Sequence, residues 1–294
     1  MFLTGFADEA ADSIEGQIHA TQELGWQCIE ARNIHGTNLH DIPDAEFEAV
    51  CAALEAAGVR VNCFGSAIAN WGQQITDSFD TSLEQTRRAI PRMQRLGAKN
   101  IRIMSFAVLK DRPPEDQMKE ERFRRLRELV AMFRDAGLTP LHENCMNYGG
   151  LGPDYTLELL DNVPGLKLVF DTGNPVFSDD CTRPKPYPKQ STWEFYQRVK
   201  DHVDYIHIKD GVWDLDESKV RFTFAGEGQG DVRAIVKHAL DNGYDGGISM
   251  EPHIAAVYHD PSADSQAEVR YRAYVEYGRR FMQLLSDIGH PYGS

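Results

Sequence analysis

DAEFEAVCAALEAAGVRVNCF (residues 44–64) contains the pattern that decides the fold. Residues 45–54 place apolar side chains at helical spacing, and Gly58 suits the left-handed conformation that ends many helices. Residues 59–64 then alternate in the way that is typical of a strand. The stretch therefore predicts one helix, a glycine stop and one strand.

The same order of helix, glycine and strand recurs around Gly25, Gly97, Gly137 and Gly243. Strands are predicted near residues 2–6, 27–32, 59–65, 100–105, 138–144, 166–171, 203–209 and 247–251. Helices are predicted near residues 12–24, 44–57, 79–96, 115–136, 154–162, 192–201, 231–242 and 264–287. Such alternation predicts an α/β protein with a parallel (β/α)8 TIM barrel. A doubly wound open sheet is the alternative, but its usual glycine-rich phosphate loop does not follow the first strand.

The chain length of 294 residues suits one barrel domain spanning residues 1–294. The C-terminal helix near 264–287 is expected to pack on the core, and contact with a second subunit in a homo-oligomer is the alternative. A net charge of −14 disfavours a nucleic-acid partner. We expect no membrane partner, because no segment approaches the roughly 20 apolar residues that span a bilayer.

Cysteine usage indicates the cellular setting. The five cysteines are odd in number and include no CxxC pair, which indicates reduced thiols and a cytoplasmic location. The N-terminal residues show no signal-peptide pattern, although a signal removed before residue 1 would leave the same sequence.

Four of the predicted strands end in metal-type ligands, which are Glu143, Asp171, His207 and Glu251. Each alone has an ordinary explanation as a turn residue, a helix cap or a core histidine. Together, three carboxylates at the C-terminal mouth of one barrel would repel one another strongly unless a cation joined them. Carboxylates with one imidazole predict Mn²⁺, Mg²⁺ or Co²⁺, and Zn²⁺ stays open.

Six further residues are candidates for substrate binding because they lie on the same strand face as a ligand, at a strand end or in a loop at that mouth. They are Lys209, Asn174, His142, Glu227, Trp213 and Arg32. Lys209 follows His207 by two residues and so shares its face of the strand. The alternatives are a structural ion pair for Lys209 and solvent-shielding packing for Trp213. For His142 the alternative is a structural role, because it points away from Glu143 on a regular strand.

Several motifs resemble those of the sugar isomerase/epimerase superfamily, whose members have a xylose isomerase-like TIM barrel. They are AGLTPLHEN (136–144), FDTGN (170–174), IHIKD (206–210), GEGQGD (226–231) and GYDGGISMEP (243–252). The resemblance spans the chain and is specific from about Gly137 onward. It implies that Glu143 and Glu251 are an acid/base pair, that Asp171 and His207 complete the metal shell, and that the substrate is a carbohydrate. Mn²⁺ is the first expectation for the cofactor.

One departure from the pattern bears on the substrate. Ketose 3-epimerases of this superfamily carry a further Glu after the fifth-strand Glu and an Arg six residues beyond the seventh-strand His, whereas this chain has NCMNY at 144–148 and Trp213. We therefore expect a metal-dependent isomerase or epimerase acting on a keto-sugar or keto-glycoside. A lyase or dehydratase acting on a 3-keto-glycoside or inosose is the main alternative. An endonuclease IV-type phosphodiesterase and a non-catalytic sugar-binding protein are weaker alternatives.

Overall fold

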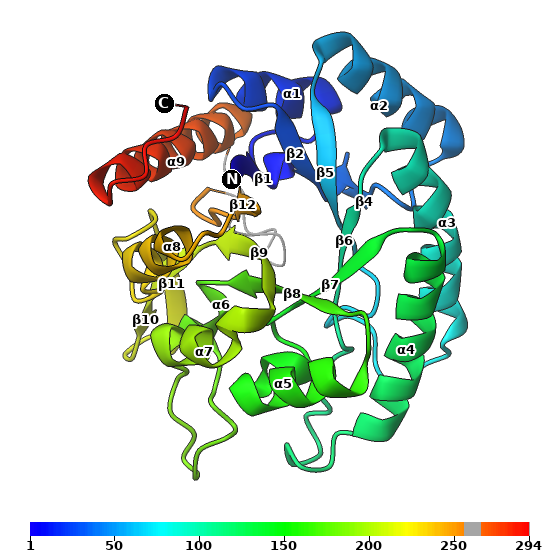
Figure 1. The fold of residues 1–294 in the computed structure, drawn as a ribbon, viewed down its shortest axis with the longest axis vertical. Coiled ribbons are helices and arrows are strands. Elements are labelled where there is room, and N and C mark those ends of the chain that lie inside the picture. Colours follow the sequence, from blue (N-terminus) through cyan, green and yellow to red (C-terminus); the bar gives the residue numbers. More distant parts are fainter. Residues whose placement is uncertain (256–265, 294) are drawn as a thin grey trace.

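The computed structural model describes residues 1–255 and 266–293, which form a barrel of strands surrounded by helices (Figure 1). The barrel strands are β1 (Phe2–Gly5), β2 (Cys28–Ala31), β5 (Arg60–Gly65), β6 (Asn100–Ile103), β7 (Thr139–Glu143), β8 (Lys167–Asp171), β9 (Val203–Ile208) and β12 (Gly247–Met250). They form one parallel eight-stranded sheet in the order β1-β12-β9-β8-β7-β6-β5-β2. The end strands β1 and β2 contact each other, so the sheet nearly closes. The predicted TIM barrel is confirmed.

The outer helices follow the predicted rhythm. They are α1 (Ile14–Glu23), α2 (Asp44–Ala57), α3 (Asp80–Leu96), α4 (Lys119–Asp135), α5 (Pro153–Asn162), α7 (Thr192–Val199), α8 (Val232–Asp241) and α9 (Ala267–Asp287). Gly58 ends α2 with a φ of 66°, in the left-handed conformation that the sequence predicts. Helix α9 buries Tyr274, Tyr277 and Phe281, as expected for core packing. Residues 264 and 265 of the predicted C-terminal helix lie outside the described residues.

Several short elements were not predicted, and all of them except η3 follow the C-terminal end of a strand. They are the antiparallel pairs β3 (Asn33–Ile34) with β4 (Thr37–Asn38) and β10 (Asp210–Asp214) with β11 (Lys219–Thr223), the short helix α6 (Asn174–Phe177), and the 3-10 turns η1 (Ala7–Glu9), η2 (Tyr148–Leu151) and η3 (Lys200–His202) at the opposite end of β9. None of them carries a clear periodic pattern of apolar residues that would identify it. The hairpin β10–β11 follows β9 directly and so stands at the mouth of the barrel.

The inside of the barrel changes from apolar to polar along the strands. A small apolar cluster fills its interior and consists of Cys63, Leu141, Val169 and Tyr205. Two residues further along β7, β8 and β9, the same inward face carries Glu143, Asp171 and His207. The larger apolar core contains side chains from both the sheet and the outer helices. Strand alternation therefore places these three predicted ligands in the layer of side chains next to the apolar cluster, toward the C-terminal ends of the strands.

Candidate metal centre

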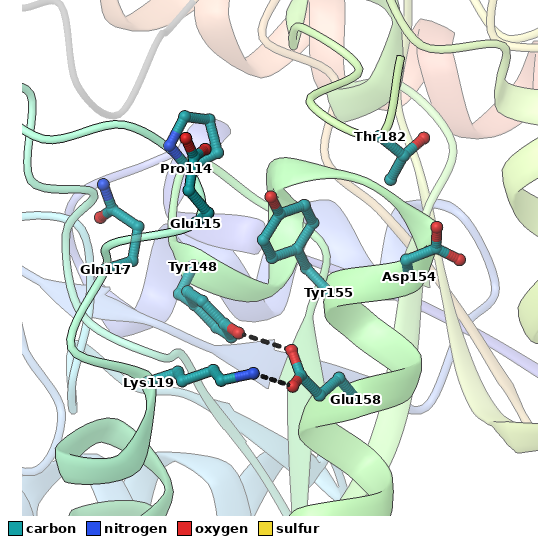
Figure 2. A pocket seen from close by; sticks show the side chains of 9 residues that line it. All are labelled: Pro114, Glu115, Gln117, Lys119, Tyr148, Asp154, Tyr155, Glu158 and Thr182. Atoms are coloured by element: carbon teal, nitrogen blue, oxygen red, sulfur yellow. Dashed lines mark hydrogen bonds and ion pairs between the residues drawn. The ribbon is translucent and has the colours of Figure 1, made fainter. Parts of the chain in front are cut away.

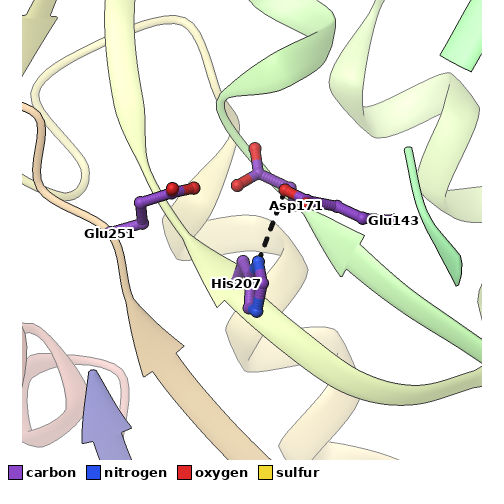
Figure 3. A group of neighbouring side chains, drawn as sticks. All are labelled: Glu143, Asp171, His207 and Glu251. Atoms are coloured by element: carbon purple, nitrogen blue, oxygen red, sulfur yellow. Dashed lines mark ion pairs between the residues drawn. The ribbon is translucent and has the colours of Figure 1, made fainter. Parts of the chain in front are cut away.

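The four predicted ligands converge at the C-terminal end of the barrel (Figure 3). Glu143, Asp171, His207 and Glu251 each offer one ligand atom, and these atoms all lie within 4.8 Å of one another. All four side chains are buried, with at most 3% of any residue exposed. Residues that lie 28 to 108 positions apart thus form one compact group.

Two atoms in this group are buried without a hydrogen-bond partner among the described residues. They are Asp171 Oδ2 and His207 Nδ1. Asp171 Oδ1 accepts backbone N–H bonds from Gly173 at 2.8 Å and Asn174 at 2.6 Å, whereas Oδ2 has only an ion pair with Lys209 Nζ at 3.2 Å. Buried polar atoms are rarely left unpaired. Orphaned donor atoms and an oxygen-rich donor set with one imidazole both fit a divalent metal ion.

Cationic side chains surround the two glutamates. Glu251 Oε1 accepts a bond from Arg32 Nη1 at 2.7 Å, and Glu251 Oε2 accepts one from Lys209 Nζ at 2.6 Å. Arg102 Nη1 donates to Glu143 Oε2 at 3.0 Å. These bonds fix the direction of each carboxylate, and they offset part of the repulsion between buried charges.

The buried charges shift the pKa values of the ligands in opposite directions. Burial by itself would raise the pKa of Glu143, but Arg102 and His207 lower it to about 2. Burial raises the pKa of Asp171 to about 6, despite the nearby Lys209 ammonium. Burial by itself would lower the pKa of His207, but Glu30 and Glu143 raise it to about 10. Opposed shifts within one buried cluster are typical of functional sites.

The group borders a narrow cavity of about 30 Å³. Three of the predicted substrate-binding residues, Arg32, Asn174 and Lys209, line this cavity. Asn174 Nδ2 also donates to Glu143 Oε1 at 3.1 Å. The cavity therefore brings these three side chains and both glutamates to the place where a substrate would meet the ligand cluster.

The other three predicted substrate-binding residues lie elsewhere. His142 Nε2 bonds Ser105 and Asn147, each at 3.0 Å, on the outer face of β7. Glu227 pairs with Arg280 on α9 at 3.1 Å. Trp213 lies on the hairpin β10–β11, and its ring packs under Lys189 Nζ at 3.9 Å. None of these three side chains is among the described residues that line the cavity.

Sequence reasoning missed two buried residues beside the ligands. Arg102 contacts Glu143, and Glu30 lies 3.1 Å from His207 Nε2. The sequence carries a signal for both, because each is a single charged residue in an otherwise apolar stretch, CIEA at 28–31 and IRI at 101–103. A charge at an inward strand position is costly unless a partner meets it.

A larger cavity of about 420 Å³ lies apart from the ligands, between residues 114–119 and helix α5 (Figure 2). Glu158 accepts hydrogen bonds there from Tyr148 at 2.9 Å and Lys119 at 2.5 Å. None of the predicted ligands lines this cavity. The donor chemistry, rather than cavity size, identifies the candidate site.

Comparisons with known proteins agree with this geometry. A family model described as "Xylose isomerase-like TIM barrel" matches residues 18–274. Among curated proteins, no sequence matches the chain. In residues 1–255 and 266–293, no helix is both long and apolar enough to cross a membrane.

Solved structures share the fold at low identity. A xylose isomerase-like TIM barrel protein from Mycobacterium smegmatis in complex with magnesium is 18% identical, with a TM-score of 0.68 over 98% of this chain and 97% of that chain. D-allulose 3-epimerase from Methylomonas sp. in complex with D-allulose is 14% identical, with a TM-score of 0.67 over 96% of each chain. The probable 3-DHS dehydratase AsbF from Bacillus anthracis is 15% identical, with a TM-score of 0.67 over 96% and 98%.

Proposed function

Because this chain belongs to the xylose isomerase-like TIM barrel family, we propose that it is a divalent-metal-dependent isomerase or epimerase. Its substrate would be a keto-sugar or keto-glycoside that loses a proton from the carbon next to its carbonyl group. The observation that carries this proposal is the pair Glu143 and Glu251, which face each other across the ligand cluster (Figure 3). Two carboxylates in this arrangement suit the removal of a proton and its return.

The residues of the chain have distinct roles in this proposal. Glu143, Asp171, His207 and Glu251 would hold the metal. When bound, the ion would supply a Lewis acid for the substrate carbonyl, which lowers the cost of removing the adjacent proton. Glu143 or Glu251 takes the proton, and the other carboxylate returns one from its own side. Lys209 Nζ donates a hydrogen bond to a substrate oxygen. Arg32 orients the Glu251 carboxylate, and Arg102 orients the Glu143 carboxylate.

The relatives support a carbohydrate-like substrate for this site. The Methylomonas enzyme is a ketose 3-epimerase bound to D-allulose, and the Bacillus enzyme is described as a probable dehydratase. We propose Mn²⁺ as the cofactor, because three carboxylates and one imidazole suit this ion. The next candidate is Mg²⁺, which the mycobacterial relative contains.

A lyase is the second candidate, and the departure from ketose 3-epimerases favours it. The chain has NCMNY at 144–148 where those enzymes carry a second Glu, and Trp213 stands in place of their Arg. The same proton abstraction on a 3-keto-glycoside or inosose would then lead to loss of a leaving group. Mass analysis of the product separates the outcomes, because epimerisation keeps the substrate mass and elimination divides it.

The proposal is tested by exchange of the substrate α-proton in D₂O. We expect the Mn²⁺-loaded protein to exchange it, EDTA to stop exchange, and added Mn²⁺ to restore it. Glu143→Gln and Glu251→Gln should each lower the exchange rate by at least about 100-fold, because general acid/base groups contribute about 10² to 10⁴. Glu128→Gln, an exposed change on α4, is the control. Exchange that is indifferent to EDTA would contradict the proposal.

A further inference from the structure

Glu30 is a fully buried carboxylate that the proposed chemistry does not use. It lies on β2 with 0% of its surface exposed, and it is not among the described residues that line the cavity. Burial of a bare carboxylate costs several kcal/mol. Such a residue needs a partner, and among the described residues no lysine or arginine forms an ion pair with it.

The partner of Glu30 is the metal-facing histidine. His207 Nε2 lies 3.2 Å from Glu30 Oε1 and 3.1 Å from Glu30 Oε2. The other ring nitrogen, Nδ1, faces the ligand cluster and lies 3.5 Å from Glu143 Oε1. The imidazole therefore lies between Glu30 and the cluster, so Glu30 can influence a metal ion only through its hydrogen bond to the ring.

This arrangement determines where the ring proton lies. An imidazole that binds a metal ion through one nitrogen keeps one N–H on the other, and an ionised carboxylate only accepts hydrogen bonds. Because Glu30 accepts from Nε2, that N–H lies on Nε2, and a cation at the cluster would bind Nδ1 in place of a proton. Phe6 at 5.1 Å and Tyr205 at 5.8 Å contact the ring nearly edge-on and restrict its rotation.

We propose that Glu30 is a positioning residue that holds His207 in the Nε2–H tautomer and so aims Nδ1 at the divalent metal ion. The inference rests on the proposed metal-dependent function of this site. Carboxylates that accept the second N–H of a metal-bound histidine raise its basicity and fix its orientation, and their loss usually weakens metal binding about 10- to 100-fold. Glu30 would act on substrate only through His207.

The first test measures Zn²⁺ affinity by calorimetry for the wild-type chain, Glu30→Gln and Glu30→Leu. Leucine removes the acceptor, so we expect the Zn²⁺ dissociation constant to rise about 10- to 100-fold. Glutamine keeps an acceptor oxygen but loses the charge, so its effect should lie between those of wild type and leucine. Asp180→Asn is the matched control, because Asp180 is also a buried carboxylate but accepts hydrogen bonds from Thr182 and has no contact with His207 or Arg32.

The second test observes the ring itself by ¹⁵N NMR of the Zn²⁺-loaded protein, with His207→Asn used for assignment. In the wild type and Asp180→Asn, Nε2 should carry the proton and Nδ1 should show the shift of a metal-bound nitrogen. In Glu30→Gln, the Nε2–H signal should exchange faster with water. A structural role limited to stability would leave this signature unchanged.

The outcomes separate this inference from the proposed function. If wild-type protein binds neither Zn²⁺ nor Mn²⁺, the metal-dependent function fails before Glu30 is tested. If wild type binds Zn²⁺ and Glu30→Gln binds within twofold of it with an unchanged Nε2–H signal, the role of Glu30 is overturned. Should Glu30→Leu not fold, Glu30→Gln with its NMR signature decides the question alone.

Discussion

Lys209 places its ammonium group where two of the metal ligands meet. Its Nζ lies 2.6 Å from Glu251 Oε2 and 3.2 Å from Asp171 Oδ2. Both carboxylates raise the pKa of Lys209 despite burial, so the side chain stays charged. A fixed positive charge at this position stabilises the carboxylates and at the same time opposes a divalent cation.

Replacement of this charge should separate metal binding from catalysis. We expect Lys209→Met to bind Zn²⁺ roughly tenfold more tightly, which is about 1.4 kcal/mol, because the competing charge is gone. The exchange of the substrate α-proton should slow by at least about tenfold, because a hydrogen bond to the substrate oxygen is lost. Calorimetry and exchange in D₂O measure the two effects.

Lys237→Met is the control for this change, because Lys237 pairs with Asp241 on the surface of α8. It should leave both quantities unchanged. Weaker Zn²⁺ binding in Lys209→Met would contradict the competing role of its ammonium group.

The stretch 226–230 folds around one carboxylate. Asp210 Oδ2 accepts backbone N–H bonds from Gly226 at 2.8 Å and Gly228 at 3.0 Å, and Oδ1 accepts bonds from Gly211 and Gly230, each at 2.8 Å. These bonds tie this loop to the start of β10 at the barrel mouth. The motif IHIKD thus contributes a ligand, a lysine beside the ligands and a loop anchor.

Gly228 is required for this close approach. A Cβ at Gly228 would lie 2.3 Å from Asp210 Oδ1 and 2.5 Å from Gly211 O, so the backbone would have to shift. We expect Gly228→Ala to lower the free energy of unfolding by about 3 kcal/mol, because overpacking strain adds to weakened hydrogen bonds. Urea unfolding measures this loss.

Gly243→Ala is the matched control for Gly228→Ala. Gly243 has a φ of 84° and a Cβ there would meet nothing within 4 Å. Its cost should be only the left-handed backbone penalty of about 1 kcal/mol. Equal losses in the two variants would show that the approach to Asp210 is not the cause.

Local pattern predicted the long elements better than the short ones. The helix that begins at Asp44 and the strand that ends at Gly65 each carry a clear period, and both form as expected. The hairpin β10–β11 was not predicted, because its strands are partly exposed and pair only with each other, so they lack the apolar run of a barrel strand. Trp213 therefore lies on a hairpin strand that the sequence pattern did not separate from a loop.

The whole barrel concentrates negative charge at one end of its axis. Three ligand carboxylates lie within one cluster, with Asp8, Glu9 and Glu30 buried nearby. Arg32, Arg102 and Lys209 balance only part of this charge. A divalent cation would balance more of it and would link strands β7, β8 and β9 with the end of β12.

Metal loading should therefore stabilise the entire fold. A cation present at 1,000 times its dissociation constant stabilises the folded state by about 4 kcal/mol, which corresponds to a rise of about 7 °C in Tm for a chain of this length. Calorimetric melting in EDTA and in Mn²⁺ measures the difference. Asp171→Asn should lose most of the rise, and a shift of equal size in that variant would count against a site at this cluster.

The order of strands and helices and the four residues of the candidate metal cluster follow from local pattern, because hydrophobic period and donor chemistry can be read along the chain. The neighbours of those ligands could not be read in this way. Glu30 meets His207 and Arg102 meets Glu143 across the barrel interior, whereas Glu227 turns away to Arg280. Contacts between inward-facing side chains depend on how the strands are staggered when the sheet curls toward closure, and no short stretch of sequence encodes that stagger.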